Sequence, residues 1–264
     1  MNMCSKRKQY KKIGFVDSGL GGLTVLIKFL DEDFFDEYVY LADNKNIPYG
    51  GKSREDLLAI SNKVAEFFNQ KQVDGLIIAC NTLTTVTLDN IKAKTDFDVY
   101  GISEYGVRGA VQATKNKKVG LLATESAVKS NYFKKALADF GIDCYQVACP
   151  EFVEIVETDK YDEDSIRLLV KKYVGYLVDK GVDTIIMGCT HYPLLRNYFE
   201  EVAPGVKFID PADTIIKEFI SEEKRVGNHN PRVDIYNTKG SKKFIDKANS
   251  IIHRKVDKLK EVNI

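Results

Sequence analysis

Residues 73–82 read VDGLIIACNT, and residues 182–191 read VDTIIMGCTH. The two stretches share four of ten residues, and both contain a cysteine, Cys80 in the first and Cys189 in the second. In each stretch a short apolar run ends at the cysteine, and hydrogen-bonding side chains follow. Such a run is typical of a buried strand in a parallel sheet. The pair therefore predicts two equivalent strands, each with a cysteine just beyond its carboxyl end.

The repeat extends over most of the chain. KKIGFVDS at residues 11–18 returns as KKVGLLAT at residues 117–124. Two further pairs of strand-like runs keep a similar offset, Tyr38–Ala42 with Cys144–Ala148 and Val99–Ile102 with Val206–Ile209. Four matches in the same order indicate an internal duplication. We expect an α/β fold of two similar lobes, each a mostly parallel sheet flanked by helices, related by a pseudo-twofold axis with the active site in the cleft between them.

Strand-like runs alternate with helical periodicity along the chain, which predicts βα units. The predicted strands are Ile13–Val16, Tyr38–Ala42, Gly75–Ala79, Val99–Ile102, Val119–Leu122, Cys144–Ala148, Thr184–Met187 and Val206–Ile209. Helical spacing covers residues 57–68, 166–177 and 244–259, the last as one amphipathic helix. We expect residues 1–98 plus 213–264 to form the first lobe and residues 99–212 the second.

Composition excludes several classes of protein. The 264 residues carry 39 basic and 38 acidic side chains, and this balance gives no electrostatic basis for binding nucleic acid or an anionic membrane. No apolar run is long enough for a membrane span, and the basic N-terminus lacks the apolar region of a signal peptide. We expect a cytoplasmic protein with a frayed N-terminus. Five cysteines without CxxC spacing and three histidines without ligand spacing argue against disulfides and a metal site.

A glycine-rich segment, GLGG at residues 19–22, follows the first predicted strand. It lacks the third glycine of a dinucleotide fingerprint and the Gly-Lys-Ser/Thr of a Walker loop, so a tight strand-to-helix turn is the better interpretation. Asp17 and Ser18 precede it. They can cap the next helix, or the Asp17 carboxylate can orient a substrate ammonium or accept a proton, and the sequence leaves both open.

Either cysteine alone would be interpreted as ordinary buried filler. Their equivalence in the repeat favours a functional role, because two facing lobes would point both thiols into one cavity. Strand-to-helix junctions there can bind a carboxylate and favour a thiolate. His191 is best interpreted as an acid–base partner of Cys189. Two opposed thiols suit removal of a proton from one face of a carbon and its return to the other, which is racemisation.

Several motifs closely resemble the glutamate racemases of the aspartate/glutamate racemase superfamily, which use no pyridoxal phosphate. They are residues 13–24 (IGFVDSGLGGLT), 48–50 (PYG), 79–82 (ACNT), 148–150 (ACP) and 188–195 (GCTHYPLL). The resemblance covers about residues 11–220. It implies interconversion of L- and D-glutamate without a cofactor or metal, supplying D-glutamate for peptidoglycan. It also implies glutamate as the small-molecule partner and allows a homodimer.

The resemblance also assigns roles. Cys80 would deprotonate D-glutamate with help from Asp17, and Cys189 would deprotonate L-glutamate with help from His191 and Glu157. The implied substrate-binding residues are Asp17, Ser18, Tyr49, Gly50, Asn81, Thr82, Thr124, Thr190 and His191.

The chain departs from the family at three places, none of which is a thiol. Thr84 and Thr85 replace Ser and Ala, Glu104-Tyr105-Gly106 replaces Glu-Pro-Gly, and Glu154 replaces a proline. The alternatives are an aspartate or hydantoin racemase, a one-thiol decarboxylase, and a two-lobed amino-acid-binding protein without catalysis. Retention of both cysteines argues against the decarboxylase, and the paired thiols argue against simple binding.

Overall fold

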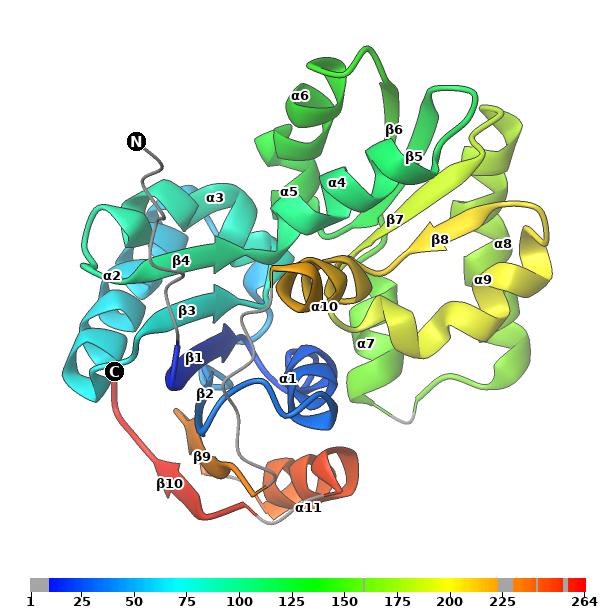
Figure 1. Cartoon of the computed structure of the whole chain (residues 1–264). Coiled ribbons are helices and arrows are strands. Elements are labelled where there is room, and N and C mark those ends of the chain that lie inside the picture. Colours follow the sequence, from blue (N-terminus) through cyan, green and yellow to red (C-terminus); the bar gives the residue numbers. More distant parts are fainter. Residues whose placement is uncertain (1–9, 159, 223–229, 241, 254–255) are drawn as a thin grey trace, which may run out of the picture.

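The computed structural model describes residues 10–158, 160–222, 230–240, 242–253 and 256–264. Its strands form two sheets, and every described strand pair is parallel. Figure 1 shows the sheets in different halves of the molecule, with helix α10 (Pro211–Ser221) between them. The predicted fold class, two α/β lobes with mostly parallel sheets, is confirmed.

The two sheets share a core of four strands in the same order. This order is β2-β1-β3-β4 in the first sheet and β6-β5-β7-β8 in the second. The strands of the first core are β1 (Lys12–Asp17), β2 (Glu37–Ala42), β3 (Gly75–Ile78) and β4 (Asp98–Gly101). Those of the second are β5 (Lys118–Ala123), β6 (Asp143–Ala148), β7 (Thr184–Gly188) and β8 (Lys207–Ile209). The repeat in the sequence thus corresponds to a repeat in topology, and all eight predicted strands are present.

The C-terminal segment enlarges the first sheet, which the sequence analysis missed. Strand β9 (Arg232–Asn237) pairs with β2, and β10 (Lys258–Glu261) pairs with β9. The prediction of one helix over residues 244–259 was wrong at its end, because α11 spans Lys242–Ile252 and Leu259 lies in β10. A few spaced apolar residues fit a helix or a short edge strand equally well, and pairing with β9 decides between them.

The predicted boundary between lobes at residues 98 and 99 falls within β4, which pairs with β3 as far as Gly101. The division of the chain into lobes stays a prediction, but the first sheet extends three residues past 98. The predicted frayed N-terminus, with Cys4, lies outside the described residues.

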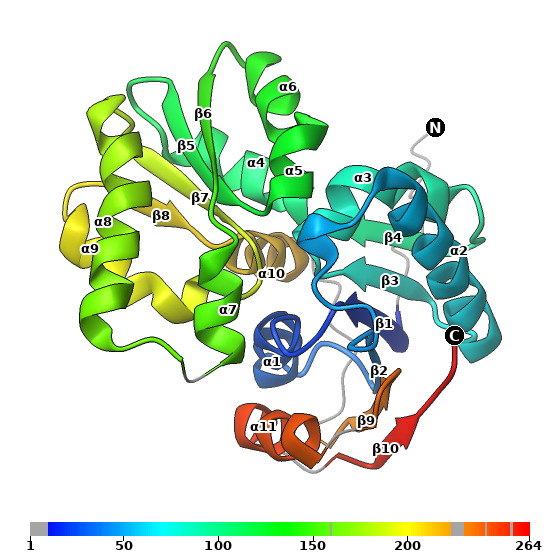
Figure 2. The ribbon, with the colours of Figure 1, turned by 180° about the vertical axis from the view of Figure 1, so that it is seen from behind.

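Helices cover both faces of each sheet, and Figure 2 shows this arrangement from behind. Helices α1 (Leu23–Asp31), α10 and α11 contribute to the apolar cluster on one face of the first sheet, and α2 (Arg54–Lys71) and α3 (Asn81–Lys92) to the cluster on the other. The remaining helices are α4 (Ile102–Ala113), α5 (Glu125–Ser130), α6 (Tyr132–Ala138), α7 (Glu151–Glu157), α8 (Glu163–Asp179) and α9 (Arg196–Val202), with short 3-10 turns η1 (Tyr49–Gly51) and η2 (Tyr192–Leu195). Within the described part of the chain, no helix is long and apolar enough to cross a bilayer.

Candidate active site

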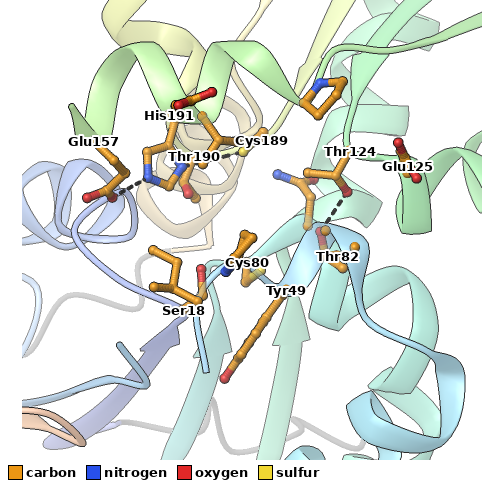
Figure 3. Close-up of a pocket in the computed structure, with 18 of the residues that line it drawn as sticks. Ser18, Tyr49, Cys80, Thr82, Thr124, Glu125, Glu157, Cys189, Thr190 and His191 are labelled. Carbon is orange, nitrogen blue, oxygen red and sulfur yellow. Dashed lines mark hydrogen bonds and ion pairs between the residues drawn. The ribbon is translucent and has the colours of Figure 1, made fainter. Parts of the chain in front are cut away.

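A cavity of ≈ 470 Å³ lies between the two lobes, at the carboxyl ends of their strands. Its wall includes both cysteines, and Figure 3 shows Cys80 and Cys189 entering it from opposite sides. The lining residues are Ser18, Ile47, Pro48, Tyr49, Gly50, Gly51, Cys80, Asn81, Thr82, Thr124, Glu125, Pro150, Val153, Glu154, Glu157, Thr158, Cys189, Thr190 and His191. The structure therefore brings together all the predicted site residues except Asp17, which lies behind the wall.

Cys80 stands at the junction between β3 and α3, as the residue that precedes the first turn of the helix. Burial raises the pKa of its thiol well above the usual range, and the nearby Asp17 carboxylate raises it further. The backbone N–H groups of Leu83 and Thr82 act in the opposite direction. Burial and the Asp17 carboxylate together thus favour the protonated form of the Cys80 thiol.

Cys189 follows β7 at the equivalent point of the second lobe, but its surroundings differ. Its Sγ lies 3.5 Å from Nδ1 of His191, and Nε2 of His191 lies 2.7 Å from Oε1 of Glu157. Burial lowers the pKa of His191, but the contacts with Cys189 and Glu157 outweigh it and raise the pKa to about 10. His191 therefore lies between the Cys189 thiol and the Glu157 carboxylate, in contact with both.

The charge of His191 also bears on stability. Its folded-state pKa of about 10 exceeds the ordinary value of 6.5. Protonated His191 therefore stabilises the fold fully below about pH 6.5, and this contribution is lost as the pH rises through about 10.

Asp17 ends β1 and is completely buried. It does not cap α1, since the residue before that helix is Gly22. Its carboxylate accepts hydrogen bonds from the backbone N–H of Gly19 (2.9 Å) and the hydroxyl of Thr190 (3.2 Å). Burial raises its pKa, although the charge of His191 and these hydrogen bonds oppose the shift. Asp17 thus raises the pKa of Cys80 on one side of the cavity and that of His191 on the other, although it does not line the cavity.

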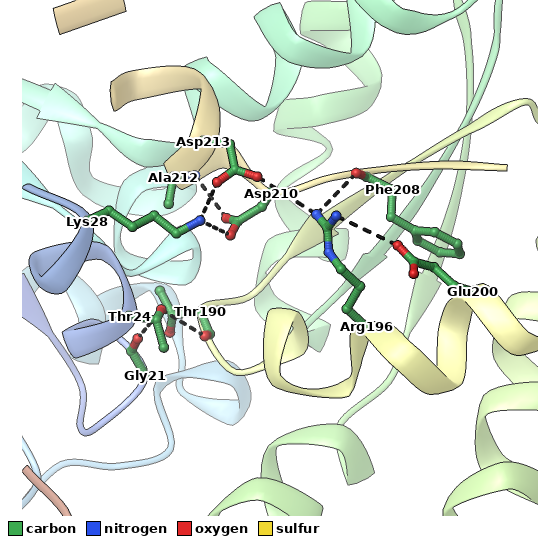
Figure 4. Close-up of polar contacts among 10 residues, drawn as sticks. All are labelled: Gly21, Thr24, Lys28, Thr190, Arg196, Glu200, Phe208, Asp210, Ala212 and Asp213. Atoms are coloured by element: carbon green, nitrogen blue, oxygen red, sulfur yellow. Dashed lines mark hydrogen bonds and ion pairs between the residues drawn. The ribbon is translucent and has the colours of Figure 1, made fainter. Parts of the chain in front are cut away.

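The glycine turn brings the lobes into close contact. A Cβ on Gly21 would lie 2.3 Å from Oγ1 of Thr190, so only glycine fits there. Figure 4 shows the adjoining contacts, in which the hydroxyl of Thr24 donates to the carbonyl of Thr190 (3.4 Å) and Lys28 pairs with Asp210 (2.8 Å). The interpretation of this segment as a tight turn is confirmed.

A second set of contacts joins the lobes at the other side of the cavity. The hydroxyls of Thr82 and Thr124 lie 2.8 Å apart, and Ser126 donates to the carbonyl of Gly50 (2.8 Å). Thr124 also caps α5, which fixes its side chain at the cavity. These polar groups can hold the carboxylates of a small substrate between the lobes.

Tyr49 lines the cavity, but its hydroxyl donates to Oδ2 of Asp43 (2.7 Å) and points away from both thiols in Figure 3. Its ring, rather than its hydroxyl, forms the wall. The sequence analysis missed eight lining residues: Ile47, Pro48, Gly51, Glu125, Pro150, Val153, Glu154 and Thr158. Half of them, Ile47, Pro48, Gly51 and Pro150, lie in or next to the PYG and ACP motifs, which were the available signals. Among the described residues, no group of three or more His, Cys, Asp and Glu side chains could hold a metal ion.

Known proteins match both this sequence and this structure. The sequence pattern of the Asp/Glu/Hydantoin racemase family matches residues 31–219. The chain belongs to this family. Over 263 residues it is 32% identical to "Glutamate racemase 3" of Caldanaerobacter subterraneus subsp. tengcongensis, with 97% of this chain and 96% of that protein covered. Racemases are isomerases, so the predicted enzyme class is confirmed.

Solved structures of the family superpose over nearly the whole chain. A glutamate racemase isoform of Bacillus anthracis gives a TM-score of 0.89 at 29% identity, covering 97% of this chain and 99% of its own. The enzyme of Francisella tularensis subsp. tularensis SCHU S4, solved with D-glutamate, gives a TM-score of 0.87 at 27% identity, covering 96% and 97%.

In this family member, Glu157→Gln is expected to lower the pKa of His191 by about 1–2 units, because it removes the carboxylate charge that faces Nε2 but keeps an acceptor oxygen there. A pH titration of His191 by NMR checks this. Glu154→Gln is the matched control, since Glu154 lies on the same helix and bonds Lys160 and Tyr161 instead. An unchanged His191 titration in Glu157→Gln would contradict the expectation.

Proposed function

We propose that the protein interconverts L- and D-glutamate by moving a proton between Cys189, the substrate α-carbon and Cys80. The observation that carries the proposal is the placement of two cysteines on facing lobes of one cavity. The family membership and the glutamate racemases among the relatives support glutamate as the substrate.

In the direction from L to D, the thiolate of Cys189 removes the α-proton and becomes a thiol. The thiol of Cys80 gives its proton to the opposite face of the same carbon and becomes a thiolate. In the reverse direction Cys80 is the base and Cys189 the acid. Protonated His191 stabilises the Cys189 thiolate, and Asp17 adjusts the ionisation of Cys80.

The carbanion formed between the two transfers is the difficult species. Fixed polar groups around the cavity, such as the hydroxyls of Thr82 and Thr124, would stabilise the carboxylate that carries its charge. The scheme needs no cofactor, because one thiolate accepts the α-proton and the opposite thiol supplies the proton that replaces it. The product D-glutamate would supply peptidoglycan synthesis in the cytoplasm, and a homodimer stays a prediction.

Incubation with L-glutamate in D₂O tests the proposal. We expect deuterium at the α-carbon and growth of the D-enantiomer, measured by NMR and chiral chromatography, with equal rates in the presence of a chelator. L-Aspartate is the comparison substrate and should exchange far more slowly. Absence of exchange with glutamate, or faster exchange with aspartate, would overturn the assignment.

A further inference from the structure

Asp43 is a buried carboxylate just beyond the carboxyl end of β2, next to the cavity but not in its wall. Three side chains donate hydrogen bonds to it. They are the Tyr49 hydroxyl (2.7 Å), the Thr238 hydroxyl (2.7 Å) and the Asn46 amide, which lies 3.0 and 2.9 Å from the two oxygens. Among the described residues, no Lys or Arg forms an ion pair with Asp43. The donors therefore offset the cost of burying its charge.

These donors come from the segment that forms one wall of the cavity. Residues 47–51 all line it, and Asp43 accepts from Asn46, which directly precedes this stretch, and from Tyr49, which lies in its middle. Backbone hydrogen bonds from Asn46 to the carbonyl of Asp43 (3.1 Å) and from Lys52 to that of Tyr49 (3.0 Å) complete the turn. The conformation of residues 47–51 is thus fixed by Asp43, whose side chain does not line the cavity.

Two further contacts extend this arrangement. The backbone N–H of Asp43 donates to the carbonyl of Asp17 (2.9 Å), which links the segment to the end of β1. Thr238, just after β9, also accepts from the backbone N–H of Lys45 (2.9 Å). Thr238 lies outside the 31–219 segment that matches the family pattern, so the C-terminal strands reach the site through it.

The wall has little freedom to shift without disturbing the other lobe. A Cβ on Gly50 would lie 2.8 Å from Cβ of Thr124, and the Gly50 carbonyl accepts from Ser126 of α5. Movement of residues 47–51 by a few tenths of an ångström would therefore alter the contact with Thr124 across the cavity.

We propose that Asp43 is a positioning residue for the substrate cavity: it holds residues 44–52 in place by accepting from Tyr49, Asn46 and Thr238. The expected effect on the KM for glutamate rests on the proposed function, whereas the expected loosening of residues 44–52 does not. Asp43 acts through Tyr49 and touches no reacting atom.

The test compares Asp43→Leu, which removes every acceptor, with Asp43→Asn, which keeps one acceptor oxygen. Asp74→Leu is the matched control, because Asp74 accepts from the backbone of Lys11 and Lys12 in the same lobe, at the opposite end of the sheet. Hydrogen–deuterium exchange of the peptide spanning residues 44–52 is the first readout. We expect faster exchange in Asp43→Leu, an intermediate rate in Asp43→Asn, and no change in Asp74→Leu.

The second readout is steady-state kinetics with glutamate. We expect the KM of Asp43→Leu to rise about tenfold while kcat stays within about threefold, because a displaced wall weakens binding of substrate and transition state alike. Asp43→Asn should recover part of the KM. If Asp43→Leu does not fold, Asp43→Asn and Thr238→Val serve in its place, since each removes part of the same set of hydrogen bonds.

Unchanged exchange of residues 44–52 in the folded Asp43 and Thr238 variants would overturn the proposal, whatever the activity. A fall in kcat at constant KM would also overturn it, because that result would place Asp43 in the chemical step. Wild-type protein that lacks glutamate racemisation would refute the proposed function instead, and the exchange measurement would still decide the role of Asp43.

Discussion

Replacing either Cys80 or Cys189 with alanine is expected to lower glutamate racemisation by about 10³-fold in both directions, the loss typical of a missing acid or base. Each direction needs a base on one face of the α-carbon and an acid on the other. Both cysteines line the same cavity from facing lobes, so neither can replace the other. The measurement is the initial rate from each enantiomer by polarimetry.

Cys144→Ala is the matched control, because Cys144 is also a free cysteine but lies on β6, away from the cavity. It should retain its activity. Circular dichroism would verify that all three variants are folded, as each substitution removes only a small side-chain group. Near-normal rates in both directions for Cys80→Ala or Cys189→Ala would eliminate the two-thiol mechanism.

The second large effect concerns the different acid–base residues near the two thiols, His191 beside Cys189 and Asp17 near Cys80. His191→Asn should reduce kcat by about 10²-fold, with the larger isotope effect on abstraction from L-glutamate, because the Cys189 thiolate loses its cationic partner at 3.5 Å. Asp17→Asn should act more on abstraction from D-glutamate, since the Asp17 carboxylate raises the pKa of Cys80 and its removal changes the ionisation of that thiol.

The equilibrium constant fixes the ratio of kcat/KM between the two directions, so the asymmetry must be measured elsewhere. The α-deuterium isotope effect on each enantiomer is the suitable quantity. The hydrogen bond from Thr190 to Asp17 and the effect of Asp17 on His191 predict partial coupling between the sides. Identical isotope effects for both enantiomers in both variants would show that the helpers are not divided between the thiols.

Much of the fold could be predicted because strands buried on both faces leave a plain signal. The runs that became β1, β3, β5 and β7 are short, apolar and bounded by polar residues, and their repetition placed Cys80 and Cys189 at equivalent junctions. Strands β9 and β10 gave no such signal. Strand β10 lies at the edge of the sheet and is only partly buried, so its sequence need not be continuously apolar.

In the candidate site, too, some residues could be predicted from the sequence and others could not. Cys80, Thr82, Cys189 and His191 follow strands directly, and local sequence fixes where a strand ends. Glu157 was supplied only by the family resemblance, and its hydrogen bond to His191 depends on how α7 packs against the loop after β7. The positions of Glu125 and Val153 in the wall likewise depend on packing between elements.

By itself, the sequence determined two duplicated α/β lobes, the two cysteines at matching strand ends and the family. Periodicity and repetition are local properties, and they can be read without knowing what lies across the cavity. Only the tertiary structure decided that Asp17 lies behind the wall, that the Tyr49 hydroxyl is bound to Asp43, and that Thr238 reaches the site from the C-terminal strands. Burial and hydrogen-bond partners across long sequence separations set these features, and a linear pattern does not encode which distant groups meet.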